Sequence, residues 1–488
     1  MNLDVLRLIL ICLANEDLLT MTCVSRGLQD EAYNELLMRP IHLDGNTRLL
    51  SFIRFVFPRN IHRLSSMRAL ILRNIGVLLQ PDIDKLVSIF QACTTLRSLH
   101  CQLSDDLLEN YRVVEAIVSL TTLTELNIWL QRDSELKLAI AWNIALHTPS
   151  RLKQLRLPLV PPKRVTTTPV RDLANAQPGL EDLMLNVYSF ADPGVAYQAL
   201  RTLSLIVEDT LPNLQDLERA FPNVRKLIFS HYMLLDVGDA LPQGHLHGDP
   251  SSTRDSTGWK SLDYLFATPA SIRVVGITCP VKHLNLGFYE VTLHREIANI
   301  VGFLRPRKLT LNVFCDAATN SGWELPHAEP SVTLHNPSTT WVKHLYLQTG
   351  YNMMSVPSTA DFLAALSPLV SSSRVELLHI SIGPFFVSDN PEEVVHPPIP
   401  MADDIPEKVK HVDVQELARG LAQTCPSVQT VAISVVMTDH YVWSIQRVDD
   451  RMEVVKLSSF EGRVRLDSEA TRLETTSSSE SDWARVRM

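Results

Sequence analysis

Apolar residues recur along most of this chain in one spacing, in which a first apolar residue is followed by others three and five positions later. The spacing occurs twelve times, from Met67-Leu70-Leu72 to Val428-Val431-Ile433. Residues two apart lie on the same face of a β-strand, so each occurrence predicts a short strand with one buried face. The first steps between occurrences are 29, 27, 29 and 28 residues, which indicates an internal repeat.

Segments with helical spacing lie between several of these strands. Ile83, Leu86, Val87 and Phe90 form one such stripe. Strands alternating with helices predict an α/β solenoid over residues 67–436. The later steps are irregular, so we expect a distorted horseshoe with one repeat near residues 255–275 too degenerate to recognise. The alternative is an ordinary α/β domain whose leucines merely alternate.

The strand pattern resembles the leucine-rich repeat. That family carries Asn or Cys eight residues after the first leucine, and this chain has Ser104, Gln131 and Tyr188 at such positions. The resemblance therefore implies the family's stacked fold without its usual side-chain ladder at these repeats.

Residues 1–43 have a different rhythm, which predicts three short helices ending at Pro40. The order of residue types resembles the F-box, although the family's opening Leu-Pro pair is replaced by Met1-Asn2. The resemblance implies docking on a Skp-type adaptor of a cullin-RING ubiquitin ligase. The matching apolar positions are Leu6, Ile9, Leu10, Leu13, Leu18, Leu19 and Val24. Alternatively, these residues only cover the open end of the first repeat.

The rest of the chain divides by composition. Residues 44–66 are expected to connect the F-box-like segment to the solenoid. Two insertions at 242–258 and 388–410 are rich in Pro, Gly and acidic residues and are expected to be mobile loops. Residues 437–466 alternate enough to predict terminal capping strands. The polar residues 467–488 are expected to form a disordered tail.

Charge and cysteine usage restrict the partners. A formal net charge of -9 argues against a dedicated nucleic-acid-binding protein. Seven scattered cysteines without a CxxC pair favour reduced thiols, and no apolar run is long enough to cross a bilayer. We therefore expect a cytoplasmic or nuclear protein that binds neither nucleic acid nor membrane.

Sequence motifs for catalysis or cofactor binding are missing. No phosphate-binding glycine loop and no hydrolase, kinase or zinc-protease motif is present. His245 and His247 are the one close histidine pair, and their surroundings offer no further ligands. We expect no enzyme activity, no cofactor and no metal; a hydrolase whose site lies in the loops is a further alternative.

A row of basic residues suggests a partner surface. The residue after the first repeat position is basic in eight of the twelve repeats, and stacking would align these side chains. Such a row could hold an acidic or phosphorylated peptide. Alternatively, the long side chains only cover apolar surface. The row comprises Arg68, Arg97, Lys153, Arg201, Arg225, Lys282, Arg307 and Lys343.

Outward positions on the strands offer a second surface for a protein substrate, with Trp129, Tyr346 and His379 as candidates. Together these features predict a substrate-recognition adaptor of an SCF-type ubiquitin ligase, which positions a substrate and leaves the chemistry to other subunits. The alternative is a repeat scaffold without any ubiquitin-ligase role.

Overall fold

The computed structural model describes residues 3–24, 26–57, 61–130, 135–157, 168–190, 194–210, 212–231, 258–289, 294–315, 341–351, 358–371, 373–384, 412–435, 439–448 and 451–474. These residues fall into two compact units. Unit 1 is formed mainly by residues up to Val224. Unit 2 is formed mainly by Arg225–Ser230 and the residues from Trp259 onward.

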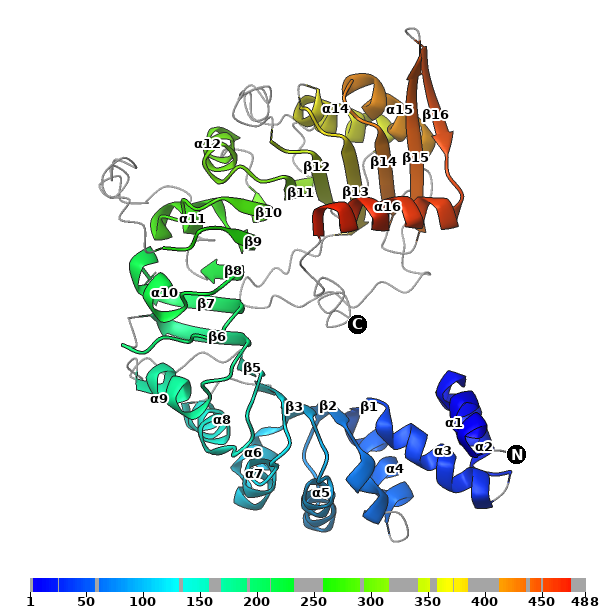
Figure 1. Cartoon of the computed structure of the whole chain (residues 1–488), viewed down its shortest axis with the longest axis vertical. Coiled ribbons are helices and arrows are strands. Elements are labelled where there is room, and N and C mark those ends of the chain that lie inside the picture. The colour runs from blue at the N-terminus through cyan, green and yellow to red at the C-terminus, as the bar shows by residue number, and fades with distance from the viewer. Residues whose placement is uncertain are drawn as a thin grey trace. The chain divides into compact units, whose positions relative to one another are not determined.

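Unit 1 starts with three helices and continues as alternating strands and helices (Figure 1). Its strands β1 to β7 pair in chain order, and every pair is parallel. The elements are α1 (Leu3–Cys12), α2 (Asn15–Met21), α3 (Arg26–Met38), β1 (Ile41–Asp44), α4 (Gly45–Val56), the 3-10 helix η1 (Ile61–Ser66), β2 (Ala69–Ile75), α5 (Gln80–Ala92), β3 (Ser98–Leu103), α6 (Asp105–Glu109), α7 (Tyr111–Val118), β4 (Glu125–Leu130), α8 (Glu135–His147), β5 (Gln154–Leu157), α9 (Thr168–Ala176), β6 (Asp182–Ser189), β7 (Thr202–Thr210) and α10 (Leu214–Ala220).

The leucines of the repeat set the register of unit 1. Leu99 of β3 stands opposite Leu70 of β2 and Leu126 of β4, and all three side chains are buried. The successive helices α5, α7, α8 and α9 contact one another in turn. The mixed α/β architecture predicted from the sequence is therefore confirmed for unit 1, with apolar strand faces stacked above each other.

The repeat begins earlier than the sequence pattern indicated. β1 lies within the segment predicted as the F-box-like region, and its Leu43 pairs with Leu72 of β2. α4 and η1 lie within residues 44–66, for which the sequence predicts only a connecting segment. Leu49, Ile53 and Val56 of α4 are buried. α4 is thus part of the stack, because its apolar stripe packs against β1 and β2.

Unit 2 repeats the same arrangement and then reverses direction. β8 to β14 are parallel and ordered along the chain, whereas β15 and β16 are antiparallel additions. The elements are β8 (Lys226–His231), β9 (Leu262–Ala267), α11 (Pro269–Val275), β10 (Val281–Tyr289), α12 (His294–Leu304), β11 (Lys308–Cys315), β12 (His344–Tyr351), α14 (Thr359–Val370), β13 (Leu377–Pro384), α15 (Val414–Thr424), β14 (Thr430–Val435), β15 (Asp439–Val448), β16 (Arg451–Lys456) and α16 (Ser459–Glu474).

The repeat that was too degenerate to recognise from sequence is β9. Leu265 pairs with Leu227 on one side and with Leu284 on the other, and Leu262 is buried at the first repeat position. The third apolar position holds Ala267. A small residue at that position hides the pattern, but its side chain still faces the core.

The terminal region differs in part from the prediction. β15 and β16 lie in the stretch predicted as capping strands, but α16 extends to Glu474, so residues 467–474 are helical and do not belong to a tail. The expected insertion at 388–410 lies outside the described residues, as does the one at 242–258 except for Gly258.

Local sequence signals explain the ends of several helices in unit 2. Asp413 caps α15 by accepting hydrogen bonds from the backbone N–H groups of Gln415 and Glu416. Thr268 caps α11 in the same way, and α11 ends at Gly276, whose positive φ of 79° suits glycine. The caps fix where each helix meets the next strand.

Candidate protein-interaction surfaces

The N-terminal helices of unit 1 enclose a small apolar core. Leu6 and Leu10 of α1, Leu18 of α2 and Ala32 of α3 are buried together. Leu13, Met21, Leu28 and Leu36 are partly buried against this core. Three of the seven predicted docking residues therefore pack inside the helical module, and Leu13 packs against them.

The other three predicted docking residues are exposed. Ile9 is 45 % exposed, Leu19 is 50 % exposed and Val24 is 62 % exposed. We call these three residues the docking patch. Leu8 and Ile11 on α1 are also exposed. Large apolar side chains at this exposure are informative when they gather on one small module.

Arg39 holds this module together. Its guanidinium donates to the backbone carbonyls of Leu10, Ile11 and Leu13 and to Oδ1 of Asn15, at 2.7 to 3.0 Å. The last carbonyls of a helix lack partners within the helix, so Arg39 caps the end of α1 from the end of α3. One signal for this cap can be read from the sequence, because α1 has no basic residue of its own in its last turn.

The basic row lies at the starts of the strands, where backbone hydrogen bonds link most positions to the next one within each unit. The carbonyl of Arg68 accepts from the N–H of Arg97, and the carbonyl of Arg307 accepts from the N–H of Lys343. The row also contains residues that are not basic. In unit 1 its positions are Arg68, Arg97, Thr124, Lys153, Glu181 and Arg201; in unit 2 they are Arg225, Asp263, Lys282, Arg307, Lys343, Glu376 and Gln429.

Acidic residues of this strand-start row pair with three of its lysines. Lys153 pairs with Glu181 at 3.0 Å. Lys282 pairs with Asp263 and Lys343 with Glu376, each at 2.7 Å. Arg201 donates to the backbone carbonyl of Asn223. The row is therefore a mixed one in which cations outnumber acids, not a uniformly basic edge.

The strand face of unit 2 presents aromatic and polar side chains in contact. The rings of Tyr346 and His379 lie 4.6 Å apart, and Nε2 of His379 is 3.0 Å from Oγ of Ser434. A second pair, Tyr264 and His283, has ring centroids 4.9 Å apart. Two of the outward residues predicted from sequence thus meet on neighbouring strands.

The strand face of unit 1 holds the third predicted outward residue, Trp129, which is half-buried on β4. Arg156 pairs with Asp182 at 3.4 Å. Asn127 is buried, and its Oδ1 has no hydrogen-bond partner.

His100 and His42 also belong to the strand face of unit 1. Burial lowers the pKa of His100; Glu125 opposes this effect, while the nearby Arg156 and Arg73 add to it. Burial also lowers the pKa of His42, with a smaller contribution from Arg73.

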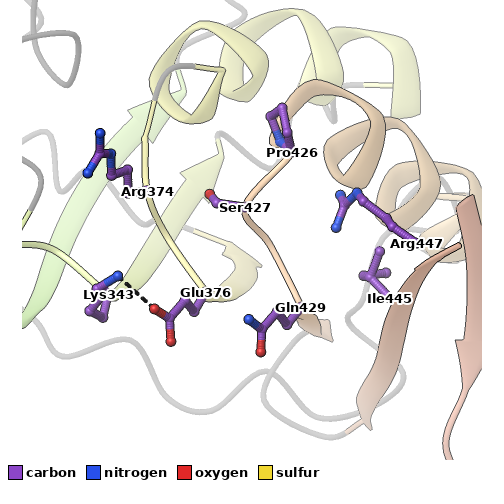
Figure 2. A pocket seen from close by; sticks show the side chains of 8 residues that line it. All are labelled: Lys343, Arg374, Glu376, Pro426, Ser427, Gln429, Ile445 and Arg447. Carbon is purple, nitrogen blue, oxygen red and sulfur yellow. Dashed lines mark ion pairs between the residues drawn. The ribbon is translucent and has the colours of Figure 1, made fainter. Parts of the chain in front are cut away.

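A shallow cavity of about 560 Å³ lies at the starts of the last strands of unit 2 (Figure 2). Lys343 and Arg374 stand on one side of it and Arg447 on the other, with Ser427 between them. Lys343, Glu376 and Gln429 are positions of the strand-start row, but Arg374, Ser427 and Arg447 lie outside that row, so the sequence did not predict the cavity. Its lining consists of Lys343, Arg374, Glu376, Pro426, Ser427, Gln429, Ile445 and Arg447.

Among the described residues, no group of three or more His, Cys, Asp or Glu side chains is arranged to hold a metal ion. In the same part of the chain, no helix is both long enough and apolar enough to span a bilayer.

Comparison with known proteins does not identify a family for this chain. No family model matches the chain, and no curated protein matches it. Among solved structures, the leucine-rich repeat-containing protein LegL7 from Legionella pneumophila aligns with 82 % of this chain and 98 % of its own, at 12 % identity and a TM-score of 0.32. A likeness at that level supports no statement about function.

Proposed function

We propose that this chain is a non-enzymatic adaptor that recruits a protein substrate to an SCF-type cullin-RING ubiquitin ligase. In this proposal the N-terminal helices dock on the Skp-type adaptor, and the stacked repeats hold the substrate. The docking patch carries the proposal, because Ile9, Leu19 and Val24 remain exposed on a module that already has an internal apolar core.

Burial of the docking patch against a partner would stabilise the complex. Full burial of a large aliphatic side chain stabilises by about 1.5 to 3 kcal/mol, so three side chains that are about half exposed could contribute roughly 2 to 4 kcal/mol together. That contribution suits an anchor at the centre of a protein interface.

The strand faces and the strand-start row are the proposed substrate surfaces. Tyr346 and His379 combine apolar rings with polar groups, a composition common in protein-binding surfaces. The chain would raise the effective concentration of substrate at the ligase and would supply no catalytic group or cofactor. We place the complex in the cytoplasm or nucleus, where thiols such as Cys93 stay reduced.

A second candidate function is a repeat scaffold with no ubiquitin-ligase role. One observation favours it: β1 joins the parallel ladder directly after α3, so the N-terminal helices also sit where an end cap is needed. The two functions differ in whether the docking patch has a partner.

Capture of a Skp-type adaptor by the purified full-length chain separates these functions. Replacing Ile9 and Leu19 together by Glu should abolish capture, because an unpaired charge in a desolvated interface costs roughly 3 kcal/mol or more. Val77→Glu is the matched control, since Val77 is an exposed apolar residue of the same unit outside the N-terminal helices.

Leu10 was predicted from the sequence as a docking residue and is the wrong one to test. Its side chain is 1 % exposed, so Leu10→Glu should disrupt the helical core before it reports on docking. Capture that persists in a folded Ile9→Glu/Leu19→Glu protein would contradict the proposed function.

A further inference from the structure

The cavity at the starts of the last strands of unit 2, which we call the strand-start cavity, is positively charged on an acidic protein. Among the lining residues that the structure describes, Lys343, Arg374 and Arg447 stand against the single carboxylate of Glu376, which gives a net charge of +2. The whole chain has a formal net charge of -9. A local excess of this sign attracts anions.

The walls of the cavity are held in place by hydrogen bonds. Arg447 donates to the backbone carbonyls of Ala422, Cys425 and Val428 at the end of α15. Ser427 donates to the carbonyls of neighbouring residues, including that of Val375 at 2.8 Å. A site arranged in advance loses less entropy when it binds a ligand.

Arg374 is the cation of the cavity whose guanidinium N–H groups are available to a ligand. It is exposed, and it makes no hydrogen bond or ion pair with any residue that the structure describes. Lys343 is already engaged with Glu376, as the dashed line in Figure 2 shows. Because a guanidinium can bind two oxygens of one anion side by side, Arg374 is the natural anchor.

The charge of the cavity selects between kinds of anion. A phosphorylated serine or threonine carries about -1.5 to -2 charges at neutral pH, which matches a net charge of +2. One carboxylate side chain would neutralise only half of that charge. Gln429 adds a polar side chain and Ile445 an apolar one, so the lining also has room for the flanking residues of a peptide.

We propose that the strand-start cavity binds a phosphorylated serine or threonine of a partner protein, with Arg374 as the main contact and Lys343 and Arg447 supplying further positive charge. This inference rests on the proposed function only in assigning the phosphorylated segment to a substrate. The binding chemistry itself depends on the cavity alone.

The test uses the purified full-length chain and immobilised pools of nine-residue peptides, random except for a central phosphoserine, serine or glutamate. We expect capture on the phosphoserine pool and little on the other two. Arg374→Glu should weaken that capture by about tenfold or more, since a charge-assisted contact is worth roughly 1.5 to 3 kcal/mol.

Two further variants make the test specific. Glu376→Gln removes the one carboxylate found among the described lining residues and should strengthen phosphoserine capture several-fold. General damage to the protein would not produce an increase. Arg419→Glu is the matched control, because Arg419 is an exposed cation on α15 of the same unit and belongs neither to the cavity lining nor to the strand-start row. It should leave capture unchanged.

The outcomes separate this inference from the proposed function. Equal capture on serine and phosphoserine pools, or an Arg374→Glu protein that binds as well as the wild type, would overturn the cavity assignment. So would binding to phosphoinositide vesicles without capture on the phosphoserine pool. Capture of the Skp-type adaptor is measured on the same proteins and should be unchanged by Arg374→Glu. A wild-type chain that captures no adaptor would contradict the ubiquitin-ligase role but not the cavity assignment.

Discussion

At the scale of single residues, exposure separates side chains that spacing cannot distinguish. Ile9 and Leu10 are neighbours with similar side chains, yet one is half exposed and the other is buried. Both fit the helical stripe in the sequence, because the stripe records which side of a helix is apolar and not which partner covers it. Which of the two side chains is buried depends on how α1 packs against α2 and α3.

The charged residues of the strand-start row could likewise be predicted only in part from the sequence. The basic residues and Glu376 stand at positions that can be read from the sequence, but the ion pair of Glu376 with Lys343 and the place of Asp263 beside Lys282 became apparent only from the structure. Exposed pairs of this kind are worth about 0.2 to 1 kcal/mol each, so they adjust the charge of the surface more than its stability.

His100 gives the stability of unit 1 a pH dependence. Its pKa is lowered in the folded protein, so the unfolded chain binds the proton more readily. Stability from neutral His100 is therefore present above about pH 6.5, the ordinary histidine value, and declines as the pH falls below it. We predict that His100→Gln flattens this decline.

The measurement is the free energy of unfolding in urea at pH 7.5 and pH 5.5. The wild type should lose more stability on acidification than the His100→Gln protein does. Replacing the exposed His62 by Gln should leave the wild-type loss in place. Equal losses in the wild type and the His100→Gln protein would show that His100 takes no part.

At the scale of elements, the strands were the most predictable part of this chain. Leu70, Leu99 and Leu126 are in register because each repeat needs the same buried positions. β9 escaped recognition since Ala267 occupies a position that usually carries a large apolar residue, and α4 escaped because no strand pattern preceded it clearly.

The Arg39 cap joins three elements, and we predict that it determines how firmly α1 is held. Arg39→Met keeps the apolar stem and removes the donors to the end of α1. Charged hydrogen bonds contribute about 1.5 to 3 kcal/mol each, so local opening of α1 should become easier by about 2 kcal/mol.

Hydrogen exchange of the backbone amides in residues 3–21 measures this opening, and about 2 kcal/mol corresponds to roughly thirtyfold faster exchange. Arg54→Met, at an exposed arginine of α4, is the control and should leave exchange in α1 unchanged. If exchange is the same in the Arg39→Met protein, the guanidinium contacts do not stabilise α1.

At the scale of the whole molecule, the proposed adaptor has separate surfaces for separate partners. The docking patch belongs to unit 1, and the strand-start cavity belongs to unit 2. Changes at Ile9 and Leu19 should leave phosphopeptide capture intact, and changes at Arg374 should leave adaptor capture intact. This independence is what a protein that links a substrate to a ligase requires.

Calorimetric titration of the purified full-length chain with a purified Skp-type adaptor tests the central claim most directly. The wild type should bind with a 1:1 stoichiometry and a negative heat-capacity change, because the docking patch moves from water into an apolar interface. Ile9→Glu/Leu19→Glu should show no binding. The titration is repeated at several temperatures, because the binding enthalpy can pass through zero at one of them. A folded wild-type chain that gives no saturable heat at any of these temperatures would contradict the ubiquitin-ligase role.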